Sequence, residues 1–142
     1  MAGKAEGVAN VVGRVVQGGR MGKARAPDEE GGELAMTNLL AKGLPLSAIA
    51  TYNDYMAAGA LSALEENNIE VPISMSIIGF DNGLIAKYLH PKLTTVRYPI
   101  QKMAENAAIL ALKLANKEKP VTDTMMFVPT LVKRLSVTKQ RV

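Results

Sequence analysis

The sequence has no cysteine, no tryptophan and a single histidine, His90, in 142 residues. Without cysteine there is no disulfide, no thiolate nucleophile and no cysteine-ligated zinc site, and this absence fits a reducing compartment. One histidine leaves little material for a histidine-based catalytic triad or a multi-histidine metal site. We therefore expect neither a metal nor a cofactor.

Long apolar runs are also missing. No window reaches the roughly 20 uninterrupted apolar residues that a membrane helix needs. The N-terminus lacks the basic-then-apolar layout of a signal peptide. The sequence therefore predicts a cytoplasmic protein without a membrane partner.

Aromatic residues are scarce, and the positive charge is unevenly placed. The formal net charge is +4, and aromatics make up 4% of the chain. Residues 1–27 contain one acid, Glu6, and the following basic residues: Lys4, Arg14, Arg20, Lys23 and Arg25. The rest of the chain is balanced, so no folded basic face or stacking platform for nucleic acid is indicated.

The first 27 residues show no sustained period. They are rich in glycine and valine, which disfavour a helix even where the valines fall at helical spacing. We interpret residues 1–27 as a poorly specified basic head, disordered or non-native. The alternative is a basic arm that contacts phosphates, but such arms normally accompany a recognisable DNA-binding module.

From Asp28 onward, helical and strand patterns alternate. This alternation predicts an α/β fold with a mainly parallel sheet flanked by helices, formed by residues 28–142. The apolar spacing predicts helices over 28–43, 53–68 and 99–116, and strands over 46–52, 74–80 and 93–98. Residues 124–137 read as two extended pieces bent at Pro129, with Met125 and Met126 filling the core.

Polar residues follow two of the predicted strands directly. Asn53 and Asp54 follow Tyr52, and Asp81 and Asn82 follow Phe80. Parallel strands would bring these loops to the edge of the sheet where α/β proteins bind ligands. A carboxylate with an amide suits the several hydroxyls of a sugar. The plainer interpretations are that Asn53 or Asp54 caps a helix and that Asn82 opens a turn.

Four segments resemble the lactose/galactose repressor (LacI/GalR) family of bacterial transcription regulators, and most of all its galactose repressor and isorepressor branch. The segments are AIATYNDYMAAGALSAL, VPISMSIIGFDN, HPKLTTVRYPI and FVPTLVKRLSV, in family order and spacing. Members have a helix-turn-helix head and a periplasmic-binding-protein-like effector domain of two subdomains, with the sugar held between them. The resemblance implies the C-terminal subdomain here, as part of an incomplete two-subdomain fold.

The resemblance also implies roles for individual residues. Asn53 and Asp81 match positions that bond effector hydroxyls in the family, while Tyr98 and Ile100 fall where the chain crosses between subdomains and line the cleft. Family members usually form homodimers. The segments that resemble their dimer interface contain Tyr55, Met56, Leu84, Ile85 and Tyr88.

The chain departs from the family pattern in three ways. The family often has a second aspartate where Asn82 stands. There is no helix-turn-helix, so we expect operator DNA to be contacted only through a head domain absent from this chain. Most of the first subdomain is also missing, which suggests a fragment. The helix from Ile100 to Leu114 would then lack its usual partner and expose an apolar stripe that drives self-association.

Three function classes compete. The resemblance favours the effector-sensing portion of a repressor that responds to a galactose-type sugar. A sugar-binding protein for transport shares the fold, but the sequence shows no export signal. A small α/β enzyme would need paired carboxylates, a nucleophile with a base, or a phosphate loop, and none is found, so we expect no enzyme activity.

Overall fold

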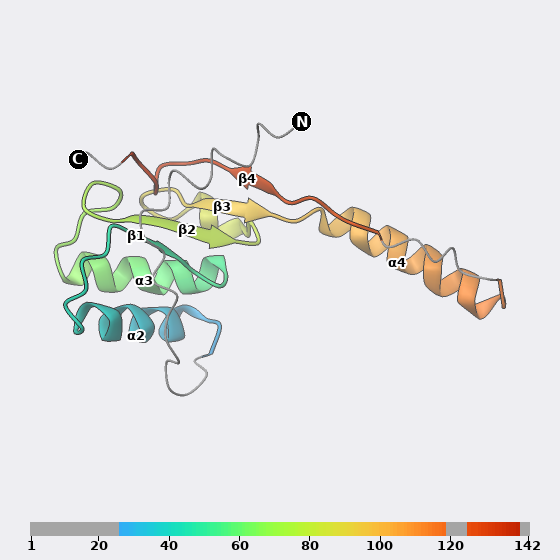
Figure 1. The fold of residues 1–142 in the computed structure, drawn as a ribbon, viewed down its shortest axis with the longest axis horizontal. Helices are drawn as coiled ribbons and strands as arrows, with labels where there is room; N and C mark the ends of the chain where they lie inside the picture. Colours follow the sequence, from blue (N-terminus) through green and yellow to red (C-terminus); the bar gives the residue numbers. More distant parts are fainter. Residues whose placement is uncertain (1–25, 119–124, 140–142) are drawn as a thin grey trace.

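The computed structural model describes residues 26–118 and 125–139. The basic head expected over residues 1–27 therefore lies almost entirely outside the described residues. Figure 1 shows a layered body of strands and helices, from which one long helix extends to the side. The elements follow one another as α2, β1, α3, β2, the short 3-10 helix η1, β3, α4 and β4.

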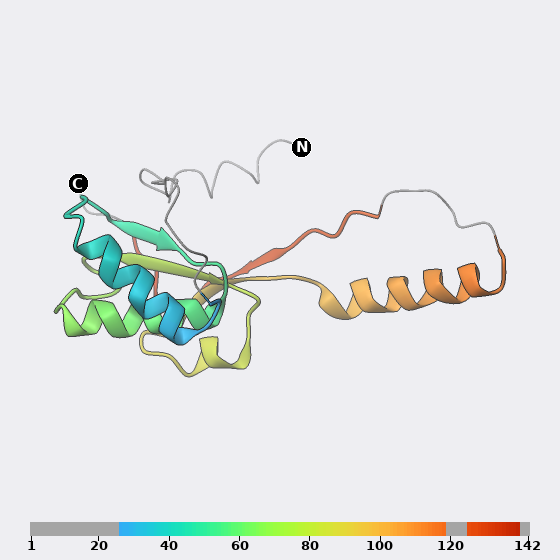
Figure 2. The same cartoon turned by 90° about the horizontal axis from the view of Figure 1, so that it is seen from below.

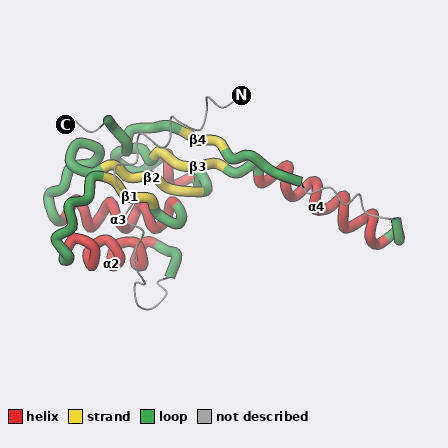
Figure 3. The backbone as a smooth tube through the Cα atoms, viewed as in Figure 1, coloured by secondary structure: helices red, strands yellow, loops and turns green. Residues whose placement is uncertain are grey.

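The sheet has four strands in the order β1-β2-β3-β4. Strands β1 (Ala48–Ala50), β2 (Ser76–Phe80) and β3 (Thr94–Arg97) are parallel, and β4 (Thr130–Val132) runs antiparallel to β3. Figure 3 shows these strands side by side. The mainly parallel α/β sheet is confirmed. Its first three strands are shorter than the predicted ranges, although Ser47 and Thr51, which flank β1, still form backbone hydrogen bonds to β2.

Two helices follow the predicted starts and stops. Helix α2 (Glu29–Leu40) begins after Asp28, whose carboxylate accepts a hydrogen bond from the Gly31 amide at 2.8 Å, and Gly43 beyond its end has a φ of +62°. Helix α3 (Asp54–Glu66) is followed by Asn68 in a left-handed conformation, φ +56°. The two helices end at Leu40 and Glu66, a few residues before the ends of the predicted ranges 28–43 and 53–68.

The core lies where α3 meets β2 and where α2 meets α3. Gly32 and Gly59 allow the two helices to approach closely, because a Cβ at either position would collide with the backbone of the opposite helix. The buried apolar side chains come from several elements: Met36, Ala57, Ala60, Leu61, Ala63, Leu64, Met75, Ile77, Ala86 and Leu93.

The C-terminal segment is fixed to the sheet by Ser136, which is fully buried. Its hydroxyl donates to the Ile77 carbonyl at 2.6 Å and accepts from the Thr94 amide at 2.8 Å, while the Ile77 amide donates to the Ser136 carbonyl. Ser136 therefore bonds to residues of both β2 and β3 that lie more than 40 positions before it in the sequence. The serine anchors the chain after β4.

Helix α4 (Ile100–Ala115) projects away from the body (Figures 1 and 2). None of its residues is buried, although its apolar side chains recur at helical spacing. The helix itself is confirmed. Met125 and Met126, on the returning segment, are 55% and 86% exposed, so their predicted place in the core is wrong. None of the helices in the described part of the chain is long and apolar enough to cross a membrane.

Candidate functional site

The three parallel strands end at one edge of the sheet, and the candidate effector residues all follow these ends. Asn53 lies shortly after β1, Asp81 directly after β2, and Tyr98 and Ile100 shortly after β3. Helix α4 begins at the same edge (Figure 1). The topology therefore gathers the loops that carry these residues, as expected for a ligand-binding edge of an α/β sheet.

Asn53 is the N-cap of α3. Its side-chain oxygen accepts a hydrogen bond from the Met56 amide at 2.8 Å, and its side-chain NH₂ donates to the Pro27 carbonyl at 2.7 Å. An asparagine side chain has two donor hydrogens and two acceptor lone pairs, so one of each remains. Asn53 thus orders the start of α3 and still has hydrogen-bonding capacity for a ligand.

Asp54 does not cap the helix, which corrects one of the two interpretations that the sequence allows. It is the first residue of α3, and its side chain is 1% exposed. Its carboxylate accepts hydrogen bonds from the Gly83 amide at 2.7 Å and the Thr95 hydroxyl at 2.6 Å. Hydrogen bonds to a charged group each contribute about 1.5–3 kcal/mol net. Asp54 therefore joins α3 to the loop after β2 and to β3.

Burial raises the pKa of the Asp54 carboxyl above its ordinary value of 3.8. The hydrogen bonds from Thr95 and Gly83 and the nearby charge of Arg134 act in the opposite direction, while the neighbouring Asp81 carboxylate adds to the rise. Desolvation has the largest effect, because a carboxylate cut off from water loses hydration that the two hydrogen bonds replace only in part.

The loop after β2 turns sharply at two non-glycine residues with positive φ, +98° at Asp81 and +52° at Asn82. The Asp81 amide donates to the Val96 carbonyl at 2.9 Å, which holds the turn beside the end of β3. The side-chain oxygen of Asn82 accepts a hydrogen bond from the Arg134 guanidinium at 2.6 Å. The backbone amide of Asn82 donates to the Thr95 hydroxyl at 3.2 Å.

The Asp81 carboxylate itself is exposed, and within residues 26–118 and 125–139 it accepts no hydrogen bond. Its backbone lies in a sparsely populated conformation, which costs roughly 1–3 kcal/mol where a non-glycine residue adopts it. Strain of this kind concentrates at functional sites. The geometry thus presents a free acceptor on a firmly held loop, suited to a hydroxyl donor.

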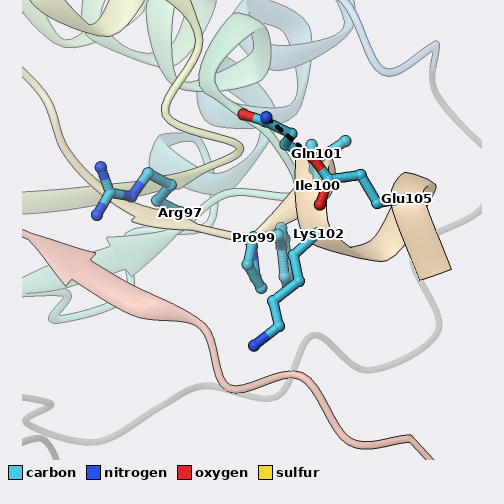
Figure 4. A pocket seen from close by; sticks show the side chains of 7 residues that line it. Arg97, Pro99, Ile100, Gln101, Lys102 and Glu105 are labelled. Atoms are coloured by element: carbon cyan, nitrogen blue, oxygen red, sulfur yellow. Dashed lines mark hydrogen bonds between the residues drawn. The ribbon is translucent and has the colours of Figure 1, made fainter.

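Tyr98 and Ile100 line a shallow, open depression of about 540 Å³ at the start of α4, together with Arg97, Pro99, Gln101, Lys102 and Glu105. Figure 4 shows that Arg97 and Lys102 point in different directions, while Gln101 donates to Glu105 at 3.0 Å. Asn53 and Asp81 do not line this depression. The Tyr98 ring stacks on Phe80 at 6.2 Å between centroids, which places it next to the last residue of β2, directly before Asp81.

The residues expected at a dimer interface lie on α3 and η1 (Leu84–Lys87), which pack against each other. Figure 2 shows η1 beside the N-terminal end of α3. Tyr55, Leu84 and Tyr88 are 51%, 68% and 74% exposed, and Met56 and Ile85 are half-buried. This α3–η1 face is therefore an exposed apolar surface directly beside the Asp54–Gly83 hydrogen bond.

The sequence does not indicate three contributions to this edge. These are the buried hydrogen-bonding role of Asp54, and the contacts made by Thr95 and Arg134. Thr95 lies in an apolar run and Arg134 in an extended tail, so neither stands out by spacing. The Arg134 guanidinium donates to the Leu93 carbonyl at 2.7 Å as well as to Asn82. Within the described part of the chain, no cluster of three or more histidine, aspartate or glutamate side chains could hold a metal.

Comparison with known proteins gives consistent matches. Residues 1–137 match the family described as "Periplasmic binding protein-like domain". The chain is 55% identical over 111 residues to the HTH-type transcriptional regulator GalR of Escherichia coli K12, which covers 78% of this chain and 32% of that protein. It is 54% identical over 111 residues to GalS of Salmonella typhimurium LT2, covering 78% of this chain and 33% of that protein.

A solved structure of a LacI family transcriptional regulator from Arthrobacter sp. FB24, in complex with lactose, superposes with a TM-score of 0.68. It is 26% identical and covers 80% of this chain and 44% of its own. The chain spans about a third of the length of the curated relatives it matches. These relatives are transcriptional regulators and not enzymes.

Proposed function

The chain belongs to the periplasmic binding protein-like domain family, among the LacI/GalR transcriptional regulators, and we propose that it is the effector-sensing portion of a galactose-type repressor. The observation that carries the proposal is the exposed Asp81 carboxylate, which follows the end of β2 at the proposed ligand-binding edge and has no hydrogen-bond donor among the described residues. A sugar hydroxyl supplies such a donor.

Further residues at the same edge support a sugar as the ligand. Asn53 keeps one donor and one acceptor beyond its bonds to Met56 and Pro27. Tyr98 and Ile100 add apolar surface where the chain leaves the sheet. Sugar sites in proteins combine a few polar contacts with such apolar walls. The lactose-bound neighbour supports the class of ligand, because lactose contains a galactose unit.

The partners and location belong to the same proposal. A homodimer would use the exposed α3–η1 face, since an apolar surface of this kind is typical of an interface. Operator DNA would be contacted by a head domain of the whole regulator, in the cytoplasm. Effector binding would change DNA affinity by shifting the balance between two arrangements of the subdomains.

Thermal unfolding with and without D-galactose tests the proposal, with D-glucose as the control sugar. Ligand at about a hundred times its dissociation constant stabilises a protein by about 2.7 kcal/mol, which moves the midpoint of a domain this size by several degrees. We expect a galactose-specific rise that disappears in Asp81→Ala. A cooperative transition that D-galactose leaves unmoved would contradict sugar sensing by this chain.

A further inference from the structure

Asp54 holds together segments that are distant in sequence. Its partners Gly83 and Thr95 lie 29 and 41 positions away. The carboxylate packs against Gly79 and fits only because residue 79 is glycine: a Cβ at that position would collide with one of the carboxylate oxygens. An aspartate that served only as a first-turn helix acid would need neither the burial nor these partners.

The two residues joined by the Asp54–Gly83 hydrogen bond each lie between a candidate effector residue and a residue of the α3–η1 face. Asp54 lies between Asn53, a candidate effector residue, and Tyr55 on the exposed α3–η1 face. Gly83 lies two residues after Asp81 and directly before Leu84, which is 68% exposed on the same face. One hydrogen bond of 2.7 Å therefore ties together two short segments that each join the ligand-binding edge to this face.

Thr95 extends the connection to β3. Its hydroxyl donates to Asp54 and accepts from the Asn82 amide, so the same side chain holds the aspartate and the loop. Arg134 closes the arrangement from the C-terminal segment through its bond to the Asn82 oxygen. These contacts hold the turn in which Asp81 and Asn82 have positive φ angles.

We propose that Asp54 is a positioning residue, which fixes the Asp81–Gly83 loop on the N-terminal end of α3 and so sets both the direction of the Asp81 carboxylate and the place of Leu84 on the α3–η1 face. Movement of the loop by a ligand then reaches this face through the Asp54–Gly83 hydrogen bond. The consequence for effector affinity rests on the proposed function, whereas the positioning of the loop does not.

Amide resonances in the NMR spectrum of the full chain test the positioning directly. In the wild type, we expect the Gly83 amide proton to shift with pH as the Asp54 carboxylate that accepts its hydrogen bond takes up a proton. In Asp54→Asn we expect this titration to vanish and hydrogen exchange to quicken at residues 81–83, while amides in α2 keep their protection. Glu65→Gln, an exposed charge removal on the same helix, is the matched control.

Titration with D-galactose tests the consequence for binding. We expect Asp54→Asn to weaken affinity by about tenfold although Asp54 itself is buried, a size typical of coupling between linked sites. If Asp54→Asn does not fold, Thr95→Val removes one of the two contacts, and we expect the same quickened exchange at residues 81–83.

The two failures are distinguishable. A wild type that binds no D-galactose contradicts the proposed function, and the Gly83 resonance then decides the positioning by itself. The inference is overturned if the Gly83 amide resonance of the wild type does not shift with pH. It is also overturned if hydrogen exchange at residues 81–83 is unchanged in a variant that folds. Unchanged galactose affinity together with quickened exchange would overturn its link to the effector.

Discussion

At the scale of single residues, Asn53 and Asp54 stand side by side and do opposite things. Asn53 is an N-cap, whose side chain accepts a hydrogen bond from the nearby Met56 backbone amide. The short-range sequence pattern indicates this role. Asp54 turns inward and takes its partners from the loop after β2 and from β3. The free energy cost of burying the carboxylate is only partly offset, which is why its pKa is raised.

The raised pKa of Asp54 predicts a pH dependence of stability. A folded-state pKa above the unfolded value means that the folded chain binds more protons, so the free energy of unfolding falls as pH rises from about 4 through the folded-state pKa. We expect wild type to lose stability relative to Asp54→Asn over this range, as measured by urea unfolding at several pH values. Acids that do not interact with Asp54 cancel in the difference, and a difference that does not change with pH would contradict the prediction.

At the scale of elements, the close contacts are made by glycines. Helices α2 and α3 approach through Gly32 and Gly59, and β2 gives room to the Asp54 carboxylate through Gly79. The strand pattern identifies β2 but does not say why a glycine stands inside an apolar strand, where it normally weakens the sheet. The reason is the carboxylate that lies across it.

Two alanine substitutions separate this packing requirement from loop flexibility. Gly79→Ala places a methyl group against Asp54 and Leu93, and overpacking of this kind costs about 1–3 kcal/mol. Gly83→Ala is the matched control, because its φ is −63° and the nearest atom to the new Cβ, an Asp54 oxygen, lies at 3.6 Å. We expect urea unfolding to show a clear loss for Gly79→Ala and almost none for Gly83→Ala. Equal losses of unfolding free energy in the two variants would contradict a specific packing requirement at Gly79.

At the scale of the whole molecule, the described part of the chain consists of a packed body and α4, none of whose residues is buried. The body has a core between α2, α3 and the sheet, whereas α4 keeps its apolar side chains in solvent, with Ile100 at 59% and Leu114 at 53% exposure. A helix gains most of its stability in proteins from burying such a face. The self-association that the sequence suggests therefore stays a prediction with a clear structural cause.

Sedimentation at several concentrations tests this self-association. We expect the weight-average mass to rise with concentration and to rise less in the double variant Met103→Gln, Leu110→Gln, which interrupts the apolar stripe. The control is Ile109→Gln, Leu112→Gln, which also replaces two apolar side chains by glutamine but on the opposite side of the helix. A monomeric mass at all concentrations would contradict the prediction.

The sequence alone indicated the helices and the three parallel strands, because periodicity, caps and turn residues act over a few positions, whereas the order of the strands in the sheet comes from the structure. It located α3, α4 and the polar ends of β1 and β2, and the family resemblance named Asn53 and Asp81 as candidates. Only the tertiary structure decided what Asp54, Thr95 and Arg134 do, because their partners lie tens of residues away and are chosen by packing. The family resemblance suggested that α4 is uncovered, and only the structure could show that none of its residues is buried, since exposure depends on what lies beside a helix and not on its own pattern.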